Sequence, residues 1–466
     1  MTEAATAEKP LINFLRGWPH ASLLAADRLR MAASHVLAAP ELMADSLLYG
    51  PDPGYEPLRE QLAVYLSAAF GAHGAPADPK RICITGGASQ NVANVLLSFT
   101  DPVFTAVVWV CAPCYHLACP IFDDAGFAGR LRAVAEDDEG IDVVRLEEGM
   151  AQLEEGTTRA SAAAKQHLPP DRKAYRHVIY VVPTSANPSG RTMTLARRQA
   201  LVRLARRHDA LILADDVYDL LQWPVADESS SASVALPPTL PRLVDVDRML
   251  PLDHDHSHDQ SSIRFGNVVS NGSFSKLVGP GVRTGWAEAT PDFVYGLSQT
   301  GNTRSGGAPS QLTASIVCEM MRSGGLDAHL SHVVRPALQR RHRTLVTAVE
   351  THLCDHVQIE NRQANTYGGY FLWLRLRRQD IAAAELAARA MAAENLVVPP
   401  GSMFRVKGDE AAAPFDHHLR LCFAWEDEDR LDEGVRRLAR VFRDWDAQPA
   451  TTTTNDLSES FTDTFK

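Results

Sequence analysis

Residues 177–219 read HVIYVVPTSANPSGRTMTLARRQALVRLARRHDALILADDVYD, and this stretch decides the fold class. The apolar run at 177–182 predicts a buried strand, 195–208 has the pattern of a helix, and 210–215 predicts a second buried strand. A strand, a helix and a strand of these lengths form a βαβ unit, whose strands lie parallel in one sheet. Such a sheet binds ligands at the carboxyl ends of its strands.

The same alternation continues on both sides of this unit. Strands are predicted at 81–85, 106–110 and 267–274, with helices after the first two. We therefore expect an α/β protein whose large domain has a mostly parallel central sheet flanked by helices. After residue 311 the pattern changes to long helices, with alternating strands at 370–376 and 419–425, which predicts a smaller α+β domain.

The expected organisation follows from these patterns. Residues 1–45 would be an N-terminal segment packing on the small domain, 46–310 the large domain and 311–447 the small domain. Residues 225–262 end in DHDHSHDQSS and read as a surface insertion within the large domain. Residues 448–466 contain TTTT with acidic and hydroxyl residues, which predicts a disordered tail.

Composition narrows the class of protein. The chain has 466 residues, enough for two or three domains at roughly 100–200 residues each. With 46 Lys and Arg against 57 Asp and Glu the net charge is −11, so we expect no partner nucleic acid and no anionic membrane surface. The sequence has no secretory signal and no apolar run long enough to span a bilayer. Its seven cysteines form no regular framework, which predicts a reducing compartment, and we expect a cytoplasmic protein.

Lysine is scarce, since Arg supplies most of the positive charge. Arg stays protonated in proteins, whereas a Lys amine can lose its proton and form a Schiff base. Lys276 lies in GSFSKLVGPGVR, among glycines and apolar residues, so it is a candidate nucleophile rather than an ordinary exposed lysine. Ser273, Ser275 and Arg283 of the same segment could bind a phosphate.

Other strand ends carry polar residues that have both a structural and a functional interpretation. Thr85–Gln90 joins a strand to a helix through two glycines, which makes either a tight turn or an anion site at a helix N-terminus. Asp215 ends a buried strand, where it either caps the next helix or pairs with a cation such as a protonated ring nitrogen, with Tyr218 able to bond an oxygen of that ring. Asn187 belongs to a turn, and Arg420 makes a surface ion pair or binds a carboxylate.

Taken together, these segments resemble the fold-type I pyridoxal 5'-phosphate (PLP) enzymes of aminotransferase class I/II, from about Ile12 to Arg443. The likeness is greatest to the branch of 2-aminoadipate and multisubstrate aminotransferases. It rests on the ordered occurrence of INFLRGWPHASLL, LLYGPDPGYEPLR, ITGGASQ, APCY, VVPTSANPSG, ADDVYDLL, GSFSKLVGPGVRTGW, GGYFLWL and VVPPGSMF.

The resemblance implies roles for individual residues. Lys276 would form the aldimine with PLP and move protons, and Asp215 would keep the ring nitrogen protonated. Tyr218 and Asn187 would bond the ring oxygen, and Tyr115 would stack on the ring. The phosphate would be held by Ala88, Ser89, Ser273, Ser275 and Arg283. Arg420, with Asn187 and Gly17 nearby, would bind the substrate carboxylate. Tyr49 would reach the phosphate of a partner subunit, which implies a homodimer with shared active sites.

The implied activity is a ping-pong transfer of an amino group from an α-amino acid to a 2-oxo acid. A PLP-dependent lyase, of the 1-aminocyclopropane-carboxylate-synthase or C–S lyase kind, needs the same cofactor residues and is the alternative. A non-enzymatic regulator with this fold would need a fused DNA-binding segment, which the roughly 45 residues before LLYG and the acidic charge do not favour.

Departures from the family pattern add further hypotheses. Arg16 stands where relatives often have glycine, so it either helps select the substrate, for example by attracting an acidic side chain, or points outward in a salt bridge. Cys111-x-x-Cys114 with Cys119 suggests zinc or redox chemistry, but there is no second CxxC, and we expect no metal. The alternating histidines 254, 256 and 258 are interpreted as a solvated loop.

Overall fold

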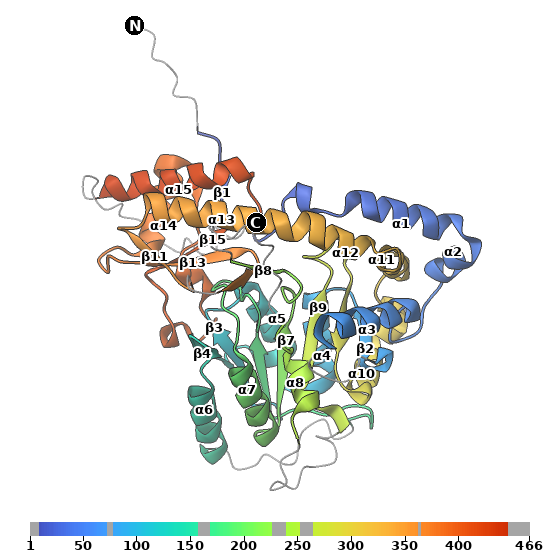
Figure 1. Ribbon diagram of the computed structural model, residues 1–466. Helices are drawn as coiled ribbons and strands as arrows, with labels where there is room; N and C mark the ends of the chain where they lie inside the picture. Colours follow the sequence, from blue (N-terminus) through green and yellow to red (C-terminus); the bar gives the residue numbers. More distant parts are fainter. Residues whose placement is uncertain are drawn as a thin grey trace.

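A computed structural model describes residues 9–71, 78–156, 168–225, 239–251, 264–361 and 365–445. Its central sheet lies in the lower half of the molecule (Figure 1). The described strands of this sheet follow the order β2-β10-β9-β7-β6-β3-β4-β5. Their bounds are Ile82–Thr85, Gly285–Glu288, Val268–Ser273, Ala210–Asp215, His177–Val181, Val107–Ala112, Leu131–Asp137 and Gly140–Ile141.

The sheet is mostly parallel. Strands β9, β7, β6, β3 and β4 are parallel neighbours, whereas β10 runs antiparallel between β2 and β9, and β5 is antiparallel to β4. The predicted fold class is therefore confirmed. The sequence pattern did not indicate β10, because GWAE is short and lacks β-branched residues.

Alternate residues of each strand enter different cores, as strand geometry requires. Val178 and Tyr180 of β6 face a core shared with α4 (Ala88–Phe99), α5 (Cys119–Phe122) and α10 (Pro291–Ser298). Ile179 and Val181 face the opposite core, covered by α6 (Val143–Gly156), α7 (Leu195–Arg207) and α8 (Leu243–Met249). Both faces of the strands are thus buried, so the strands read as continuous apolar runs.

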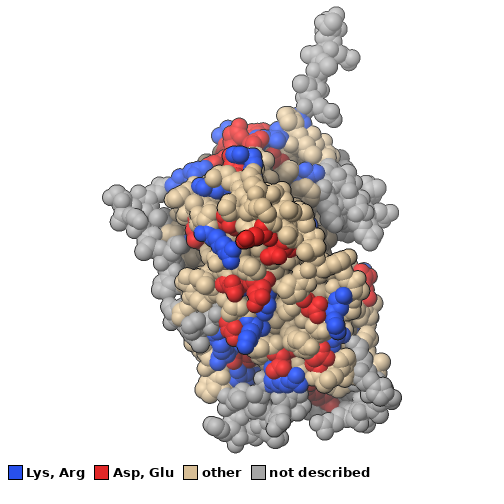
Figure 2. Space-filling model, turned by 90° about the vertical axis from the view of Figure 1, so that its right-hand side faces the viewer, with Lys and Arg blue, Asp and Glu red and all other residues tan. Residues whose placement is uncertain are grey.

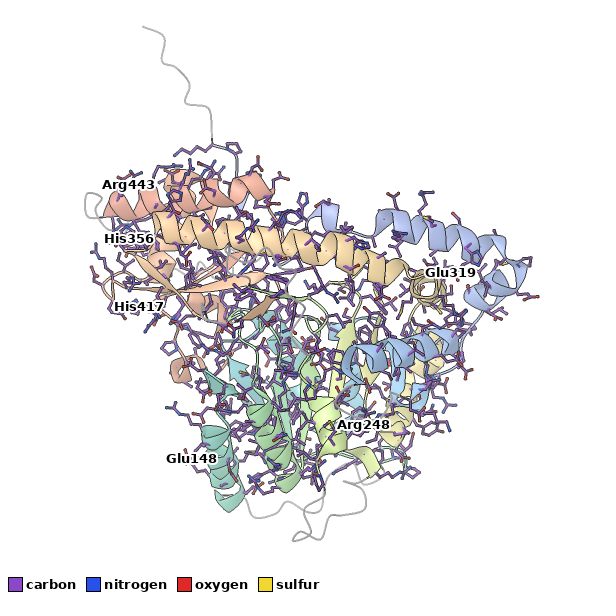
Figure 3. All side chains as sticks on the ribbon, viewed as in Figure 1. Glu148, Arg248, Glu319, His356, His417 and Arg443 are labelled. Carbon is purple, nitrogen blue, oxygen red and sulfur yellow. The ribbon has the colours of Figure 1, made fainter. Side chains whose placement is uncertain are left out.

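A second sheet lies at the upper left of Figure 1. Its antiparallel strands are β11 (Val357–Ile359), β13 (Phe371–Leu376) and β15 (His418–Cys422). The helices that accompany it are α13 (Arg335–His352), α14 (Ala383–Glu394) and α15 (Glu428–Arg443). His356, just beyond α13, stacks on Phe442 of α15 with ring centroids 4.5 Å apart, at the end of the molecule where Figure 3 labels His356 and Arg443. This is the α+β part that the sequence predicts.

The N-terminal segment makes two kinds of contact. Strand β1 (Ile12–Asn13) pairs in parallel with β14 (Leu396–Val397), beside the second sheet. Helices α1 (Ala26–Ala38) and α2 (Pro40–Leu47) instead pack on α11 (Gln311–Arg322). A short pair, β8 (Gln222–Pro224) with β12 (Thr366–Gly368), joins the two halves of the chain, and α3 (Glu56–Phe70) packs on β2. The division into domains remains a prediction.

The expectation of a surface insertion at 225–262 is wrong for residues 243–249. These residues form α8, and its Leu243, Val244 and Val246 are buried against α7 and β9. Their apolar side chains recur along one side of the helix, which drives that side into the core. The predicted tail at 448–466 lies outside the described residues. The helix predicted after the 106–110 strand begins at Cys119, after a 3-10 turn at His116–Ala118.

The face of the molecule seen in Figure 2 has mixed charge. On the face seen in Figure 2, acidic and basic side chains alternate over the described residues. None of the described helices has the length and apolar character needed to cross a bilayer.

Candidate active site

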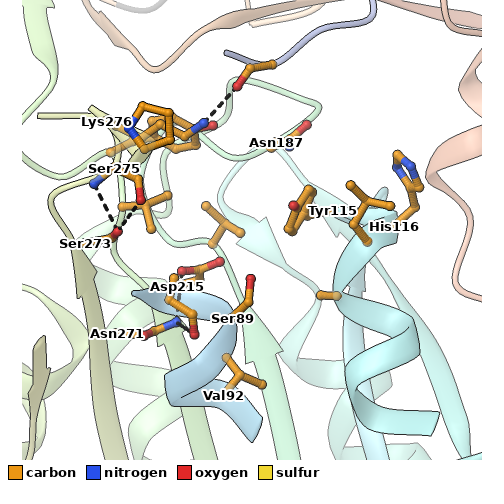
Figure 4. Close-up of a pocket in the computed structure, with 18 of the residues that line it drawn as sticks. Ser89, Val92, Tyr115, His116, Asn187, Asp215, Asn271, Ser273, Ser275 and Lys276 are labelled. Carbon is orange, nitrogen blue, oxygen red and sulfur yellow. Dashed lines mark hydrogen bonds between the residues drawn. The ribbon is translucent and has the colours of Figure 1, made fainter. Parts of the chain in front are cut away.

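A cavity of about 270 Å³ opens at the carboxyl ends of the parallel strands (Figure 4). It brings together residues from the N-terminal segment, the central sheet and β15. All the predicted site residues except Tyr49 line it. They are Arg16, Gly17, Ala88, Ser89, Tyr115, Asn187, Asp215, Tyr218, Ser273, Ser275, Lys276, Arg283 and Arg420.

Lys276 lies in the turn that follows β9. Its Nζ donates a hydrogen bond of 2.8 Å to the carbonyl oxygen of Gly17 and lies 4.9 Å from the centre of the Tyr370 ring. Burial lowers the pKa of Lys276 to about 8, and the positive charge of Arg420 acts in the same direction. A fraction of the amine is therefore neutral near pH 7, which is the form that attacks a carbonyl group.

Asp215 lies at the end of β7, where burial raises the pKa of its carboxyl group to about 6. Its Oδ2 accepts a hydrogen bond of 2.7 Å from the hydroxyl of Tyr180, and its Oδ1 accepts one of 3.2 Å from the amide of Asn271. These neutral donors orient the carboxylate but do not balance its charge. A cation in the cavity, such as a protonated ring nitrogen, would do so.

The turn between β2 and α4 forms one end of the cavity. Gly87 precedes α4 with φ of +101°, and a Cβ there would lie 2.5 Å from Nη2 of Arg283. The backbone N–H groups of the first helical turn, at Ala88 and Ser89, have no partner within the helix. Close backbone approach and a helix N-terminus together favour an anion.

Two serines and an arginine complete this end. The Oγ of Ser273 donates a hydrogen bond of 3.0 Å to the Oγ of Ser275 and accepts one of 3.1 Å from its backbone N–H. Arg283 donates to the Oγ of Ser275 at 3.3 Å and to the carbonyl oxygen of Gly86 at 3.0 Å. The hydroxyl groups, the guanidinium group and the helix N-terminus have the donor chemistry of a phosphate site.

Arg420 forms the other end of the cavity. One Nη donates a hydrogen bond of 2.9 Å to Oδ1 of Asn187, and the other donates to the carbonyl oxygen of Leu15. The guanidinium group lies between the rings of Phe371 and Phe404, at 4.1 and 4.6 Å, and its Nε is buried with no hydrogen-bond partner among the described residues. Burial lowers its pKa to about 10. A substrate carboxylate would satisfy this unpaired donor.

The two predicted tyrosines of the ring site are both protonated at neutral pH. Burial raises the pKa of Tyr218 well above its usual value, and its ring lies 5.5 Å from that of Tyr370. Burial, reinforced by the negative charge of Asp215, raises the pKa of Tyr115. Figure 4 shows Tyr115 across the cavity from Ser273 and Ser275.

Arg16 lies at the mouth of the cavity. Its guanidinium carbon is 5.3 Å from the ring of Trp18 and 5.0 Å from the ring of Trp425, and these two rings meet edge to face at 5.7 Å. Trp18 is 45% exposed, so the cluster of Arg16, Trp18 and Trp425 borders solvent. Both an aromatic and an acidic group could contact this cluster.

Tyr49 is the predicted site residue that the chain does not bring to the cavity. Its side chain is 91% exposed, and its ring lies near Gly306. Within a single chain it therefore has no place in this site.

Three residues of the site are not predicted from the sequence. Tyr180 and Asn271 hold Asp215, and His116 lines the cavity beside Tyr115. Asn271 had a usable signal, because it is a polar residue within the buried strand NVVSNGSF. Tyr180 had none, since tyrosine is common in strands and only the tertiary pairing of β6 with β7 places it beside Asp215.

The cysteine motif lies within the described residues, whereas the histidine motif does not. Among the described residues, no group of three His, Cys, Asp or Glu side chains is arranged to hold a metal ion. Histidines 254, 256 and 258 lie outside the described residues. Cys114 lies near Cys119, with the two Sγ atoms 3.9 Å apart.

Comparisons with known proteins agree with this geometry. A family model described as aminotransferase class I and II matches residues 25–438. An uncharacterized protein of Saccharomyces cerevisiae, YER152C, is 32% identical over 92% of this chain and 96% of its own length. The 2-aminoadipate transaminase of Thermus thermophilus is 27% identical over 94% of this chain and 91% of its own. The fold is similar to a crystal structure of the kynurenine aminotransferase of Pyrococcus horikoshii, with TM-score 0.72, 24% identity, and 93% and 91% of the two chains covered.

Proposed function

The chain belongs to the aminotransferase class I and II family and is a PLP-dependent aminotransferase, and on this premise we propose how its own residues carry out the reaction. The observation that carries the proposal is a single cavity in which a lysine amine of lowered pKa, a buried carboxylate and an anion-binding turn all face one another. These are the groups that a phosphorylated pyridine aldehyde requires.

The donor set fits PLP. Ala88, Ser89, Ser273, Ser275 and Arg283 would hold the phosphate, since they combine free N–H groups, hydroxyls and a cation at one end of the cavity. Asp215 would accept a hydrogen bond from the ring nitrogen and keep it protonated. Tyr218 and Asn187 would donate to the ring oxygen, and Tyr115 would pack on the ring face. Lys276 would carry the covalent bond to the cofactor.

When bound, PLP supplies an electron-accepting ring that stabilises the negative charge left when the substrate loses its Cα proton. Lys276 moves that proton, because its amine is the basic group within the cavity whose pKa burial brings near neutrality. Tyr180 and Asn271 keep the carboxylate of Asp215 aimed into the cavity throughout. The reactive atoms are thereby fixed before the substrate arrives.

Arg420 binds the α-carboxylate of the substrate in this proposal, and Asn187 and the backbone of Gly17 lie beside it. The Phe371 and Phe404 rings hold the guanidinium plane, and Asn187 fixes one of its nitrogens. A fixed plane suits the two-pronged geometry of a carboxylate. The substrate would displace the Leu15 and Gly17 carbonyl oxygens from their present donors, Arg420 and Lys276.

We propose that Arg16 helps to choose the amino donor by attracting an acidic side chain. It lines the mouth of the cavity, and the T. thermophilus relative is named for a substrate with a second carboxylate. Arg16→Ala should lower kcat/KM for 2-aminoadipate relative to that for an aromatic donor by about tenfold. Unchanged ratios among donors would contradict this role.

A homodimer with shared active sites is also proposed. Tyr49 is 91% exposed, and the neighbouring Leu47 and Leu48 are 60% and 67% exposed, so this stretch presents an apolar surface. A second copy packed here would bury it and bring Tyr49 of the partner subunit to the phosphate. Sedimentation of the PLP-loaded protein should give a dimer, and Tyr49→Phe should weaken PLP binding by about three- to tenfold without altering the dimer.

A cytoplasmic location is proposed as well, with a role in a biosynthetic pathway of amino acid metabolism. All seven cysteines are free thiols, which suits a reducing compartment. Burial raises the pKa of the Cys83, Cys111, Cys318 and Cys422 thiols, so these four are inert as nucleophiles.

The experiment that tests the activity is a donor panel with absorbance readout. The PLP-loaded enzyme is mixed with one donor at a time and no oxo acid, using 2-aminoadipate, lysine, aromatic amino acids and S-adenosylmethionine. Transamination should convert the cofactor stoichiometrically to its amine form, and a 2-oxo acid should then restore the aldehyde form. Release of ammonia or a thiol with no amine form of the cofactor would identify a lyase instead.

A further inference from the structure

The segment from Cys114 to Cys119 forms a wall of the active-site cavity. Tyr115, His116 and Ala118 within it line the cavity, and both cysteines lie just behind that lining, 3% and 1% exposed. Their Sγ atoms are 3.9 Å apart and share a hydrogen bond. The reaction uses neither thiol.

The CxxC spacing suggests that Cys111 pairs with Cys114, whereas in the structure Cys114 lies next to Cys119. Cys111 belongs to β3 and borders the core on the α6 and α7 side of the sheet, whereas Cys114 and Cys119 belong to the core on the other side. Strand alternation places Cys111 there, and the turn after β3 then carries Cys114 back toward α5. The fold therefore places Cys114 next to Cys119, and Cys111 on the opposite side of the sheet.

The two thiols have unequal acidity. The hydrogen bond from Cys114 lowers the pKa of Cys119, and the backbone N–H and charge of Lys407 act in the same direction. The same hydrogen bond raises the pKa of Cys114, and the carbonyl oxygen of Arg405 lies 3.4 Å from its sulfur. Cys119 is thus the more acidic of the two thiols, which suits Cys119 as the attacking thiol and Cys114 as the resolving one.

We propose that Cys114 and Cys119 are a reversible oxidation site, at which a peroxide converts the dithiol to a disulfide and thereby distorts the cofactor-facing wall at Tyr115. The thiolate of Cys119 attacks hydrogen peroxide, forms a sulfenic acid and releases hydroxide. The thiol of Cys114 then attacks that sulfur, an S–S bond forms, and water leaves with the sulfenic oxygen. Two thiols and one peroxide give one disulfide and two water molecules.

The distortion follows from where the two cysteines are anchored. Cys114 is held by its backbone N–H, which donates to the carbonyl oxygen of Phe404 at 2.9 Å, and Cys119 begins α5. To bond, the sulfurs must approach by about 1.9 Å from their present 3.9 Å. The strain falls on the residues between them, including Tyr115 and His116. This consequence rests on the proposed role of Tyr115 at the cofactor ring.

Mass spectrometry tests the bond itself. The full chain, loaded with PLP under reducing conditions and then desalted, is treated with hydrogen peroxide, unfolded and alkylated. We expect a cross-linked peptide joining Cys114 to Cys119, lighter by two hydrogen atoms, while Cys83, Cys318 and Cys422 are alkylated. Cys119→Ser and Cys119→Ala should abolish the cross-link, and the matched variant Cys111→Ser should keep it. A link from Cys111 to Cys114, or no link in the wild-type chain, would overturn the proposal.

Cofactor absorbance and the donor half-reaction test the consequence. Peroxide should shift the absorbance of bound PLP and slow the half-reaction by at least about tenfold, since a displacement near 1 Å can cost about a hundredfold. Dithiothreitol should restore both, and Cys119→Ser should respond to neither reagent. A disulfide that leaves both readouts unchanged would overturn the link to the cavity. Because the cross-link is detected independently of turnover, its absence is distinguishable from failure of the assigned cofactor site.

Discussion

The two ends of the active-site cavity are built in different ways. The phosphate end comes from two strand-to-turn segments, 85–89 and 273–283, each of which carries its donors within a few residues. The carboxylate end depends on Arg420 meeting Asn187 and Leu15, which are 233 and 405 residues away along the chain. The phosphate end is thus formed by residues that are close together in the sequence, and the carboxylate end by contacts between distant parts of the chain.

The ends also differ in exposure to water. At the phosphate end Ser273 is buried, but Ser89 and Arg283 are exposed and Ser275 is half-buried. Arg420, in contrast, is 3% exposed and lies against two phenylalanine rings. An ionic contact in a buried position is stronger and less replaceable than one near solvent. Loss of Arg420 should therefore cost more than loss of any single phosphate contact, and the variants below test that difference.

The largest effect is expected between the two ends, at Lys276. Lys276→Ala should lower transamination by about four orders of magnitude or more, because no other described side chain of the cavity is a lysine that could take its covalent role. Single-turnover absorbance with an amino donor measures this loss. Lys80→Ala, at an exposed lysine, is the matched control and should retain the wild-type rate. Comparable rates in both variants would remove Lys276 from the mechanism.

At the carboxylate end, Arg420→Lys should raise KM for the amino donor by about 30- to 100-fold. Lysine keeps the charge but cannot present two parallel N–H groups to a carboxylate, and its shorter polar head leaves the Asn187 oxygen without its donor. Steady-state kinetics on matched donors measures the change. Arg375→Lys, on the neighbouring strand β13 and half-exposed, is the control. An unchanged KM would place carboxylate binding elsewhere.

At the phosphate end, Gly87→Ala should weaken PLP binding by about tenfold. The backbone there has φ of +101°, and the new Cβ would meet Arg283 at 2.5 Å, so the turn and the guanidinium must both shift. Fluorescence titration of the cofactor-free protein with PLP gives the dissociation constant. Gly129→Ala is the matched control, because Gly129 also has positive φ, +74°, but lies outside the lining of the cavity and has no atom within 4 Å of the added carbon. Equal affinities for the two variants would show that the contact with Arg283 is unimportant.

The smallest effect is a pH dependence. With the pKa of Lys276 near 8, the neutral fraction of its amine should rise from about one-tenth at pH 7 to about nine-tenths at pH 9. Because only the neutral amine attacks a carbonyl, the rate at which PLP and borohydride label Lys276 should rise with pH and level off above about pH 9. Peptide mass spectrometry follows the label, with Lys80 as the control. A rate that keeps rising to pH 10 would mean that burial does not lower this pKa.

The sequence predicted most of the fold because its signals are local. The strands β2, β3, β6, β7 and β9 read as apolar runs of the right length, and α4 and α7 have clear helical patterns. The sequence did not indicate β10 or α8. Strand β10 is short, and α8 is a seven-residue helix within a polar stretch, so the local pattern of each is weak compared with the tertiary contacts that hold it.

The residues of the candidate site also differ in whether the sequence alone identifies them. Lys276 was identified from its Gly-rich segment and from the scarcity of lysine, and Asp215 from its place at a buried strand end. The partners of Asp215 were not identified, because Tyr180 and Asn271 belong to two different strands that only the pairing order of the sheet brings beside it. Which side chains are neighbours across a sheet cannot be deduced from the spacing of residues along the chain.

The sequence by itself determined the α/β class, the family and which residue types meet at the strand ends, because those depend on short-range periodicity and turn chemistry. Tertiary structure decided which distant groups touch. It set Arg420 against Leu15 and Asn187, and it paired Cys114 with Cys119 rather than with Cys111. The physical reason is that such contacts depend on how whole strands and helices pack against one another. Residues far apart in the sequence meet only after the long stretch of chain between them has folded.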